Sequence, residues 1–370
     1  MRILFINHEY PPFGGGAATI TQELFSRFEN SKHEVHLLTG NIQTNKQNIT
    51  SIKTRRKSNS EGSVWGFIKF ILLGFFKLRS IHKSFQPDIV FAFFTIPGGM
   101  LARIYKFLFK TPYIVSIRGG DIPGFQLGKK HEKFQKFAKP LVLKIRKKAT
   151  LIHVNSQRLY NLTIQNAIDL DKVTILPNGI NLQDFSYREN IVGEKLKILF
   201  TGRLSKQKNL DVFLKALSLA KIDFQFTIIG NGPEKENLVK IVQDNSLNVE
   251  FLDWMERVKL QQLYREYNIF ILPSMDEGMS NSALEAVVNQ CALLSSKNAH
   301  LQWKDEEIMS EWVVDDYLNP GEWLYCLDNL SDNFNKINDI SIKMKQFIHE
   351  KNDWNKLFPK YEEMILKCVE

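Results

Sequence analysis

Cysteine is scarce in this sequence, which has only Cys291, Cys326 and Cys368 among 370 residues. Their spacing matches neither a disulfide framework nor a zinc site. A disulfide-stabilised secreted protein is therefore excluded. We expect free, mostly buried thiols in a reducing compartment.

Long apolar runs are also missing. No stretch of the chain reaches the roughly 18–20 uninterrupted apolar residues that a membrane-spanning helix requires. The N-terminal stretch MRILFINHEY has no signal-peptide layout, because its short apolar run continues directly into a strand pattern. These observations favour a cytoplasmic protein.

Acidic residues are few in the first half of the chain. Residues 1–185 contain 27 Lys and Arg but 11 Asp and Glu, and the remainder contains 22 and 29, which accounts for all 49 basic and 40 acidic residues. This asymmetry predicts two domains with different partners. The basic half would suit nucleic acid, anionic lipid or an acidic substrate.

Strand-like and helix-like segments alternate throughout, which is typical of an α/β protein. The apolar runs predict buried parallel strands, and the segments between them predict covering helices. We expect strands at 2–6, 33–39, 88–94, 112–117, 150–155, 197–204, 224–229, 249–254 and 269–274, and helices at 17–28, 64–85, 97–110, 130–148, 209–219 and 257–266. The polar stretch 41–62 is expected to be a mobile loop.

Three loops of the second half are candidates for a ligand site. GRLSKQKN (202–209), GNGPE (230–234) and SMDEGMSN (274–281) each follow an expected strand, and open α/β sheets bind ligands beyond the carboxyl ends of their strands. Arg203 and Lys208 supply two cations. The backbone N–H groups that follow Glu277 stand at an expected helix N-terminus, which favours an anion. Together these groups predict a diphosphate cradle.

Glu277 and Glu285 lie on either side of that helix start. Carboxylates accept hydrogen bonds from hydroxyls, and a nucleotide-sugar has hydroxyl-rich groups at both ends of its diphosphate. The pair is therefore suited to hold the donor sugar and the ribose. The alternative is that Glu277 only stabilises the helix dipole and that Glu285 is an exposed helix residue.

Several stretches resemble the retaining GT-B glycosyltransferases, a large group whose members carry two Glu separated by seven residues. LPSMDEGMSNSALEA carries that spacing, and ILFTGRLSKQKNLDVFLKAL resembles the family's phosphate-binding strand and loop. YPPFGGG, LPNGINLQDF and DWNKLFPKYEE are similar to its acceptor-side loop, interdomain connector and last helix.

The resemblance, to family 4-like members of group 1, implies a particular domain arrangement. Two doubly wound Rossmann-like domains of a GT-B fold would face each other across a cleft. The implied segments are an N-terminal acceptor-binding domain (1–185), a nucleotide-sugar-binding domain (186–350) and a last helix that crosses back to the N-terminal domain (351–370).

The resemblance also implies roles for individual residues. Arg203 and Lys208 would neutralise the leaving nucleoside diphosphate, Glu277 would contact the donor sugar, and Asp121 would contact sugar or acceptor. The donor-binding residues would be Gly15, Gly16, Gly202, Gly230, Asn231, Gly232, Gly278, Met279, Ser280, Asn281 and Glu285. Arg118, Gly119 and Gly120 would lie on the acceptor side, with Arg118 in place of a histidine that the family often has there.

The implied reaction transfers a hexose or N-acetylhexosamine, with retention, from a UDP-linked donor to a lipid-linked or surface-polysaccharide acceptor in bacterial cell-envelope glycan biosynthesis. No cofactor and no metal are expected, because Arg203 and Lys208 would carry the electrostatic work. The alternatives are a GT-B epimerase or phosphorylase and, more distantly, a basic nucleic-acid-binding protein. No recognisable nucleic-acid-binding motif supports the last alternative.

Two helical segments predict peripheral contact with an anionic membrane. Residues 129–148 hold nine Lys and Arg and one Glu, with Phe134, Phe137, Leu141 and Ile145 at helical spacing and an expected break or kink near Pro140. Residues 64–76 are apolar and aromatic. An N-terminal domain that rests on lipid would use both segments. The alternative is that both apolar stripes pack into the domain core and that the charges are solvated.

Overall fold

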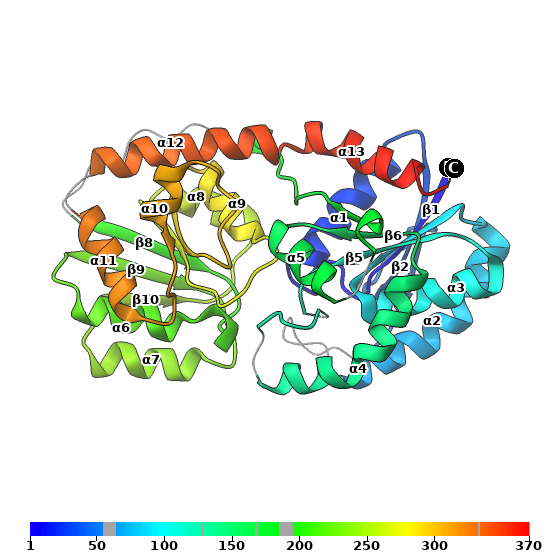
Figure 1. Ribbon diagram of the computed structural model, residues 1–370, viewed down its shortest axis with the longest axis horizontal. Coiled ribbons are helices and arrows are strands. Elements are labelled where there is room, and N and C mark those ends of the chain that lie inside the picture. Colours follow the sequence, from blue (N-terminus) through cyan, green and yellow to red (C-terminus); the bar gives the residue numbers. More distant parts are fainter. Residues whose placement is uncertain are drawn as a thin grey trace. The chain divides into compact units, whose positions relative to one another are not determined.

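The computed structural model describes residues 1–54, 64–120, 122–126, 129–166, 169–184, 195–331 and 334–369. The chain divides into two compact units, each with its own sheet (Figure 1). Unit 1 comprises Met1–Phe125, Lys129–Asn178 and Asn355–Glu370, and unit 2 comprises Gln126–Gly128 and Gly179–Trp354.

Unit 1 contains a seven-stranded parallel sheet in the order β3-β2-β1-β4-β5-β6-β7. Its strands are β1 (Arg2–Ile6), β2 (Glu34–Gly40), β3 (Ile49–Ile52), β4 (Ile89–Phe93), β5 (Tyr113–Ile117), β6 (Leu151–Val154) and β7 (Val173–Ile175). Its helices are α1 (Gly16–Glu29), α2 (Val64–Phe85), α3 (Met100–Phe109), α4 (Lys129–Lys148) and α5 (Gln157–Gln165), and α13 (Trp354–Leu366) begins at the last residue of unit 2. Short helical turns are η1 (Phe94–Gly99) and η2 (Leu170–Lys172).

The order of the strands decides which face each helix covers. The chain crosses from β1 to β2 in one direction and from β3 through β4 and β5 to β6 in the other. Because such crossovers are right-handed, α1 lies on one face of the sheet and α2, α3 and α4 lie on the other (Figure 1). Helix α13 joins α1, where the rings of Phe28 and Phe358 are 4.9 Å apart.

Unit 2 repeats this design with a six-stranded parallel sheet in the order β10-β9-β8-β11-β12-β13. The strands are β8 (Leu196–Thr201), β9 (Phe224–Ile229), β10 (Val249–Leu252), β11 (Ile269–Leu272), β12 (Ala292–Ser296) and β13 (Val313–Val314). The helices are α6 (Leu210–Leu219), α7 (Lys235–Asp244), α8 (Arg257–Tyr264), α9 (Asn281–Val288), α10 (Glu306–Trp312), α11 (Pro320–Ser331) and α12 (Phe334–Lys351), with turns η3 (Leu182–Asp184) and η4 (Lys206–Lys208).

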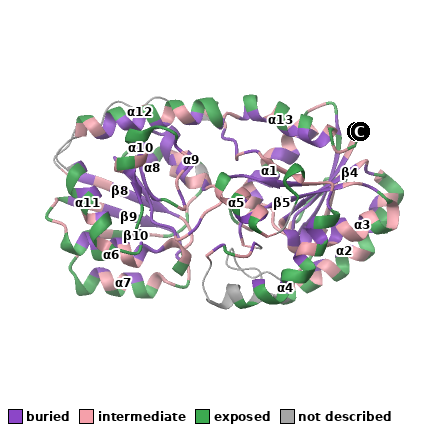
Figure 2. Cartoon of the chain, in the orientation of Figure 1, coloured by how far each residue is buried: buried purple, intermediate pink, exposed green. Residues whose placement is uncertain are grey.

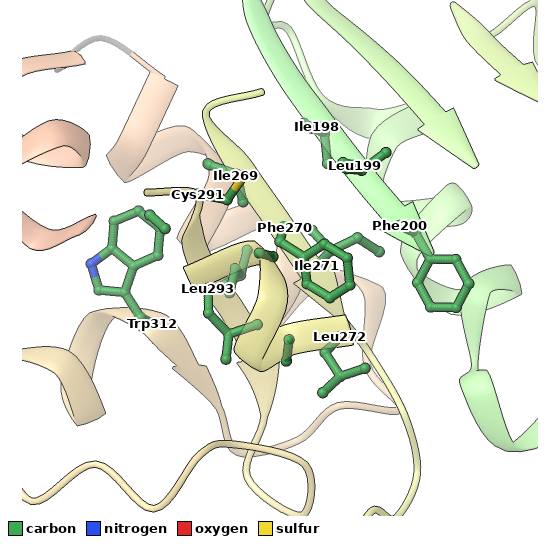
Figure 3. Close-up of a cluster of buried hydrophobic side chains, with 14 of the residues drawn as sticks. Ile198, Leu199, Phe200, Ile269, Phe270, Ile271, Leu272, Cys291, Leu293 and Trp312 are labelled. Atoms are coloured by element: carbon green, nitrogen blue, oxygen red, sulfur yellow. The ribbon is translucent and has the colours of Figure 1, made fainter. Parts of the chain in front are cut away.

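The central strands of both sheets are buried on both faces (Figure 2), as expected where helices cover a parallel sheet. In unit 2 the apolar side chains of β8 and β11 pack with residues of neighbouring elements, among them Leu293 and the fully buried Trp312 (Figure 3). This packing holds the carboxyl ends of β8 and β11, which are direct neighbours in the sheet, in fixed positions.

The predicted α/β architecture with two parallel sheets is confirmed, and all three cysteines are free, two of them buried. The loop predicted at 41–62 is wrong in part, because Ile49–Ile52 pairs with β2 as strand β3. This strand has only four residues, and its polar Thr50 and Ser51 hide the pattern. Residues 55–63 lie outside the described part of the chain.

A break near Pro140 does not occur, because α4 is one helix that contains this proline. The alternative, a kink, agrees with the bend of α4 in Figure 1. The predicted apolar stripe of α4 does not share one environment. Ile145 is buried, whereas Phe137 is 88% exposed, and the side chain of Phe134 lies outside the described set. No described helix meets the length and hydropathy that a membrane crossing requires.

Candidate functional site

The three loops predicted to bind a ligand follow β8, β9 and β11 in unit 2. These strands are parallel, and β8 lies between the other two. Their carboxyl ends therefore meet at one edge of the sheet, between strands that connect in opposite directions. Such a switch point is where open α/β sheets bind ligands.

The first two loops are joined by backbone hydrogen bonds. The N–H of Gly202 donates to Ile229 O and that of Leu204 donates to Asn231 O, both at 3.0 Å, and Glu234 N donates to Leu204 O at 3.0 Å. A Cβ atom on Gly230 would lie 2.0 Å from Gly202 O, and the φ angle of Gly230 is +138°. Only glycine allows the loops to approach this closely.

Gly232 makes the same kind of close approach. A Cβ atom there would lie 2.2 Å from Leu204 O. Arg203 lies between Gly202 and Leu204, whose backbones are both fixed by the second loop, and is half-buried. The sequence-predicted Gly202, Arg203, Gly230, Asn231 and Gly232 are thus brought together.

The third loop is joined to the first through η4. Met275 N donates to Gln207 O at 2.8 Å, and the side chain of Gln207 donates to Asp276 O at 2.7 Å. Next to these contacts, the Lys208 ammonium donates to a carboxylate oxygen of Glu277 in an ion pair. The structure therefore brings Lys208 and Glu277 into direct contact.

This ion pair is largely shielded from water. The side chain of Lys208 is 16% exposed and that of Glu277 is 13% exposed. A charge pair in such a position costs desolvation energy, and loss of one partner would leave the other poorly compensated. Both charges remain close to the surface and could regroup around a charged ligand.

Residues that the sequence did not indicate hold the two partners in place. Asn209 has a left-handed conformation directly after Lys208 and donates to Tyr317 O at 2.9 Å. Asn298 accepts from Glu277 N through its backbone oxygen at 3.1 Å, and its side chain donates to Met275 O and to the Tyr317 hydroxyl, both at 3.1 Å.

Asn298 lies in the turn directly after β12 and joins that turn to the third loop. The sequence signal that could have indicated Asn298 is its place as a polar residue just beyond a buried strand. The partnership with Tyr317 depends on tertiary packing and has no local signature.

Helix α9 begins directly after the third loop. The Ser280 hydroxyl caps it by accepting from Ala283 N at 3.3 Å. Within the described residues, the N–H groups of Gly278 and Ser280 donate no hydrogen bond. These amides, near the positive end of the helix dipole, are suited to an anion. Asn281 and the half-buried Glu285 lie in α9, and Met279 precedes it.

The remaining predicted residues belong to unit 1. Gly15 precedes α1, and Gly16 is its first residue. The loop before them is held by Asn7, whose amide donates to the Thr21 hydroxyl at 2.7 Å. A Cβ on Gly15 would meet nothing within 4 Å, so the backbone there borders open space.

Arg118 lies at the carboxyl end of β5 in a polar cluster. It donates to Asn178 Oδ1 at 2.7 Å, and its guanidinium carbon is 5.1 Å from the centre of the Phe93 ring. Burial lowers the pKa of Arg118, while interaction with Tyr361 partly offsets this. Gly119 and Gly120 follow, and Gly119 has a φ of +111°. Asp121 lies outside the described residues.

His153 belongs to the same cluster and is fully buried. Burial, with a smaller contribution from the Arg118 charge, lowers its pKa to about 3. Its ring contacts the Ser116 hydroxyl at 2.8 Å and Leu176 O at 2.9 Å. The imidazole is therefore neutral at physiological pH, and Arg118 supplies the positive charge of the cluster.

The described residues contain no group of three or more His, Cys, Asp or Glu that could hold a metal ion. One Asp-x-Asp pair does occur, at Asp169 and Asp171, and both residues are exposed beside η2 in unit 1. The expectation of metal independence stays a prediction.

Family models match residues 14–315 in two parts. Residues 14–184 match "Glycosyltransferase Family 4", and residues 183–315 match "Glycosyl transferases group 1". A Klebsiella pneumoniae "Uncharacterized 41.2 kDa protein in cps region" is 26% identical over 302 residues, which cover 78% of this chain and 79% of the relative.

A second relative is the N-acetylgalactosamine-N,N'-diacetylbacillosaminyl-diphospho-undecaprenol 4-alpha-N-acetylgalactosaminyltransferase of Campylobacter jejuni. It is 25% identical over 285 residues, which cover 76% of this chain and 77% of the relative. Both relatives therefore align along most of their length.

Solved structures share the fold at low sequence identity. Sucrose-phosphate synthase from Thermosynechococcus elongatus has a TM-score of 0.85 at 14% identity and covers 99% of this chain and 98% of its own. Anabaena Alr3699/HepE in complex with UDP and glucose has a TM-score of 0.77 at 15% identity and covers 99% and 100%.

Proposed function

Because the chain belongs to the group 1 and family 4 glycosyltransferases of the GT-B fold, we propose that it transfers a hexose or N-acetylhexosamine with retention from a UDP-linked donor. The acceptor is a lipid-linked or surface-polysaccharide glycan of the bacterial cell envelope. Relatives of this kind support the acceptor class, since one is named for a diphospho-undecaprenol substrate and another for a cps region.

The observation that carries the proposal is the meeting of three loops around Lys208 and Glu277 in unit 2. When a donor binds, the Lys208 ammonium moves from Glu277 to the diphosphate. Arg203 and the amides of Gly278 and Ser280 complete the cradle. Glu277 is then free to accept hydrogen bonds from the sugar hydroxyls, and Glu285 accepts from the ribose.

The reaction follows from this arrangement. The bond from the anomeric carbon to the diphosphate breaks first in an oxocarbenium-like transition state, and the cradle stabilises the negative charge that develops on the leaving group. The acceptor hydroxyl attacks from the same face, which retains the configuration. Its proton passes to the departing phosphate, so no protein nucleophile is required.

Unit 1 contributes Gly15 and Gly16 to donor binding and Arg118, Gly119 and Gly120 to the acceptor side, with Asp121 as a contact to the sugar or the acceptor. His153 beside Arg118 is neutral, so Arg118 carries the positive charge of that buried cluster. The proposed reaction uses neither cofactor nor metal.

A thermal-shift panel of nucleotide-sugars tests the donor class. A donor present at about a hundredfold excess over its dissociation constant stabilises the native state by about 2.7 kcal/mol. A UDP-sugar is expected to raise the melting temperature, and GDP- or ADP-sugars are expected not to. Shifts of equal size with every nucleotide would contradict the donor assignment.

Product analysis then tests the chemistry. Release of UDP shows that the donor has been consumed. NMR of the anomeric proton of the glycosylated product then distinguishes retention from inversion. An epimerase would return a changed nucleotide-sugar, and a phosphorylase would consume phosphate. Formation of an inverted glycoside would overturn the retaining mechanism while leaving the transferase in place.

A further inference from the structure

Helix α2 carries apolar side chains on two of its sides. Phe70, Leu78 and Ile81 are buried, and Gly74 allows close packing against Leu101 of α3. These residues account for the part of α2 that covers the sheet. Phe67 and Phe85 add ring contacts to His8 and His36, so the packing of α2 uses one set of its apolar side chains.

A second apolar stripe of α2 is exposed. Trp65 is 80% exposed, Leu72 59% and Phe76 71%, with Ile68 and Leu73 at 40% each. Positions 65, 68, 72 and 76 are three or four residues apart and so lie on one side of the helix. Large apolar side chains in such a row are unusual on the surface of a soluble protein and mark an interaction site.

The neighbouring helices continue this feature. Phe107 on α3 is 77% exposed, and on α4 Phe137 is 88% exposed and Leu141 38%. All three helices cover the same face of the sheet in unit 1 (Figure 1). Along each of these helices, exposed residues alternate with buried ones (Figure 2), so the side turned away from the sheet is exposed.

The charges around these residues have one sign. Helices α2 and α3 contain no Asp or Glu, and α4 contains only Glu132. The exposed basic residues on the three helices and at the C-cap of α3 are Lys77, Arg79, Lys83, Lys110, Lys133, Lys136, Lys139, Lys144, Lys147 and Lys148. The ammonium of Lys110 stands 5.8 Å from the centre of the exposed Phe107 ring.

Other cations lie close to Lys106 of α3. Burial and the nearby charges of Lys172 and Lys148 lower its pKa, and its ammonium donates to Lys148 O at 3.1 Å. Positive charges are thus close together between α3 and α4.

We propose that α2, α3 and α4 form a docking surface for an anionic lipid bilayer, with Trp65, Leu72, Phe76, Phe107 and Phe137 inserted at the level of the headgroups. Aromatic side chains favour that region, and basic side chains around them reach the lipid phosphates. The charge of these helices, which is positive apart from Glu132, is complementary to the negative surface of an anionic bilayer.

The proposal goes beyond the transfer reaction, and one consequence deepens it. A unit that rests on a bilayer through these helices would meet an acceptor whose lipid part stays in the membrane. Within 64–76, Phe70 packs into the core, and the exposure of Trp65, Leu72 and Phe76 favours a surface role for the other side of the helix. On α4, Phe137 takes the same role and Ile145 belongs to the core.

Vesicle flotation tests the proposal directly. The full-length protein is expected to float with vesicles of phosphatidylcholine and phosphatidylglycerol and not with phosphatidylcholine alone. The Trp65→Ser, Phe76→Ser double variant should weaken binding to the anionic vesicles by about tenfold or more, because two aromatic side chains no longer insert. Circular dichroism and melting temperature should stay unchanged, since both side chains are exposed.

A matched control uses exposed apolar residues of unit 2. Leu219 is 61% exposed and Tyr325 is 66% exposed, and Leu219→Ser with Tyr325→Ser should leave vesicle binding unchanged. Lys136→Gln, Lys139→Gln and Lys144→Gln should each reduce binding about fivefold. The equivalent changes at Lys215, Lys221 and Lys240 of unit 2 should have no effect.

Three results would overturn the docking surface: no binding of the wild-type protein to anionic vesicles, equal losses in the two sets of variants, or binding to duplex DNA that anionic vesicles do not displace. The thermal shift with UDP-sugar, measured on the same variants, separates this proposal from the proposed function. Vesicle binding without any nucleotide effect would remove the transferase assignment and leave the surface intact.

Discussion

At the scale of single residues, the contact between Lys208 and Glu277 defines the candidate donor site. The two residues are 69 positions apart, and the parallel order of β8 and β11 brings them together. Their convergence could be predicted from the sequence because both follow strands that end at one edge of a sheet. The support from Asn298 and Tyr317 could not, since it depends on how loops of different elements pack.

Glu277→Gln tests the role of that carboxylate. The amide keeps the size of the side chain but loses the negative charge that accepts strongly from sugar hydroxyls. We expect kcat/KM for sugar transfer to fall by roughly 100-fold, or about 2.7 kcal/mol, with little change in the affinity for UDP. The measurement is steady-state kinetics with the donor found in the thermal-shift panel.

The control for this variant is Glu236→Gln, at an exposed position of α7. It should retain wild-type rates. A Glu277→Gln enzyme with full kcat/KM would show that the carboxylate serves only to hold Lys208.

His153 provides a prediction of pH dependence. Its pKa is about 3 in the folded protein, against 6.5 for an unperturbed histidine, because the ring is buried and lies near Arg118. Between pH 6.5 and pH 3, the histidine of the unfolded chain therefore binds a proton that the histidine of the folded chain does not. Its contribution to stability is complete above pH 6.5 and is lost as the pH falls toward 3, by up to about 1.4 kcal/mol per pH unit.

Denaturant unfolding at several pH values between 6.5 and 4 checks this expectation. The free energy of unfolding of the wild type should fall more steeply with acidification than that of His153→Gln. The difference between the two slopes should correspond to the uptake of about one proton on unfolding. The difference between the two proteins removes the contribution of the carboxylates that both share. Parallel curves would contradict the assignment of a depressed pKa to His153.

At the scale of elements, the apolar strands and the loops that follow them were predictable, since buried parallel strands leave a strong pattern. Strands β3 and β7, with four and three residues, were not, because such short segments carry little periodicity. The apolar stripe of α4 misled for a related reason. Helical spacing shows that residues share a side of a helix but does not show how far a neighbouring element covers that side.

Gly230→Ala tests the junction between the first two loops of unit 2. The added Cβ would overlap Gly202 O at 2.0 Å, and a φ of +138° strains any other residue. We expect a loss of about 2–4 kcal/mol in the free energy of unfolding, together with weaker nucleotide binding. Chemical denaturation and a UDP titration measure the two effects.

Gly15→Ala is the matched control for stability. Its φ is −115°, and a Cβ there meets nothing within 4 Å, so the free energy of unfolding should stay within about 1 kcal/mol of the wild-type value. Equal destabilisation by the two substitutions would show that the close contact at Gly230 is not what fixes the loops.

At the scale of the whole molecule, the uneven distribution of charge agrees with a division of labour between two units. Unit 1 contains the basic helices α2, α3 and α4, and unit 2 contains the loops of the candidate donor site. All residues of the proposed diphosphate cradle come from unit 2. Nucleotide binding should therefore be insensitive to substitutions on the exposed helices of unit 1.

The central claim is that Lys208, Arg203 and the amides after Glu277 bind the diphosphate of a nucleotide-sugar. Isothermal titration calorimetry of UDP into the wild type, Lys208→Ala and Lys215→Ala tests it most directly, since Lys215 is an exposed lysine of the adjacent helix α6. The account predicts that Lys208→Ala weakens UDP binding by about 30-fold or more and that Lys215→Ala binds as the wild type does. Equal dissociation constants for all three proteins would contradict it.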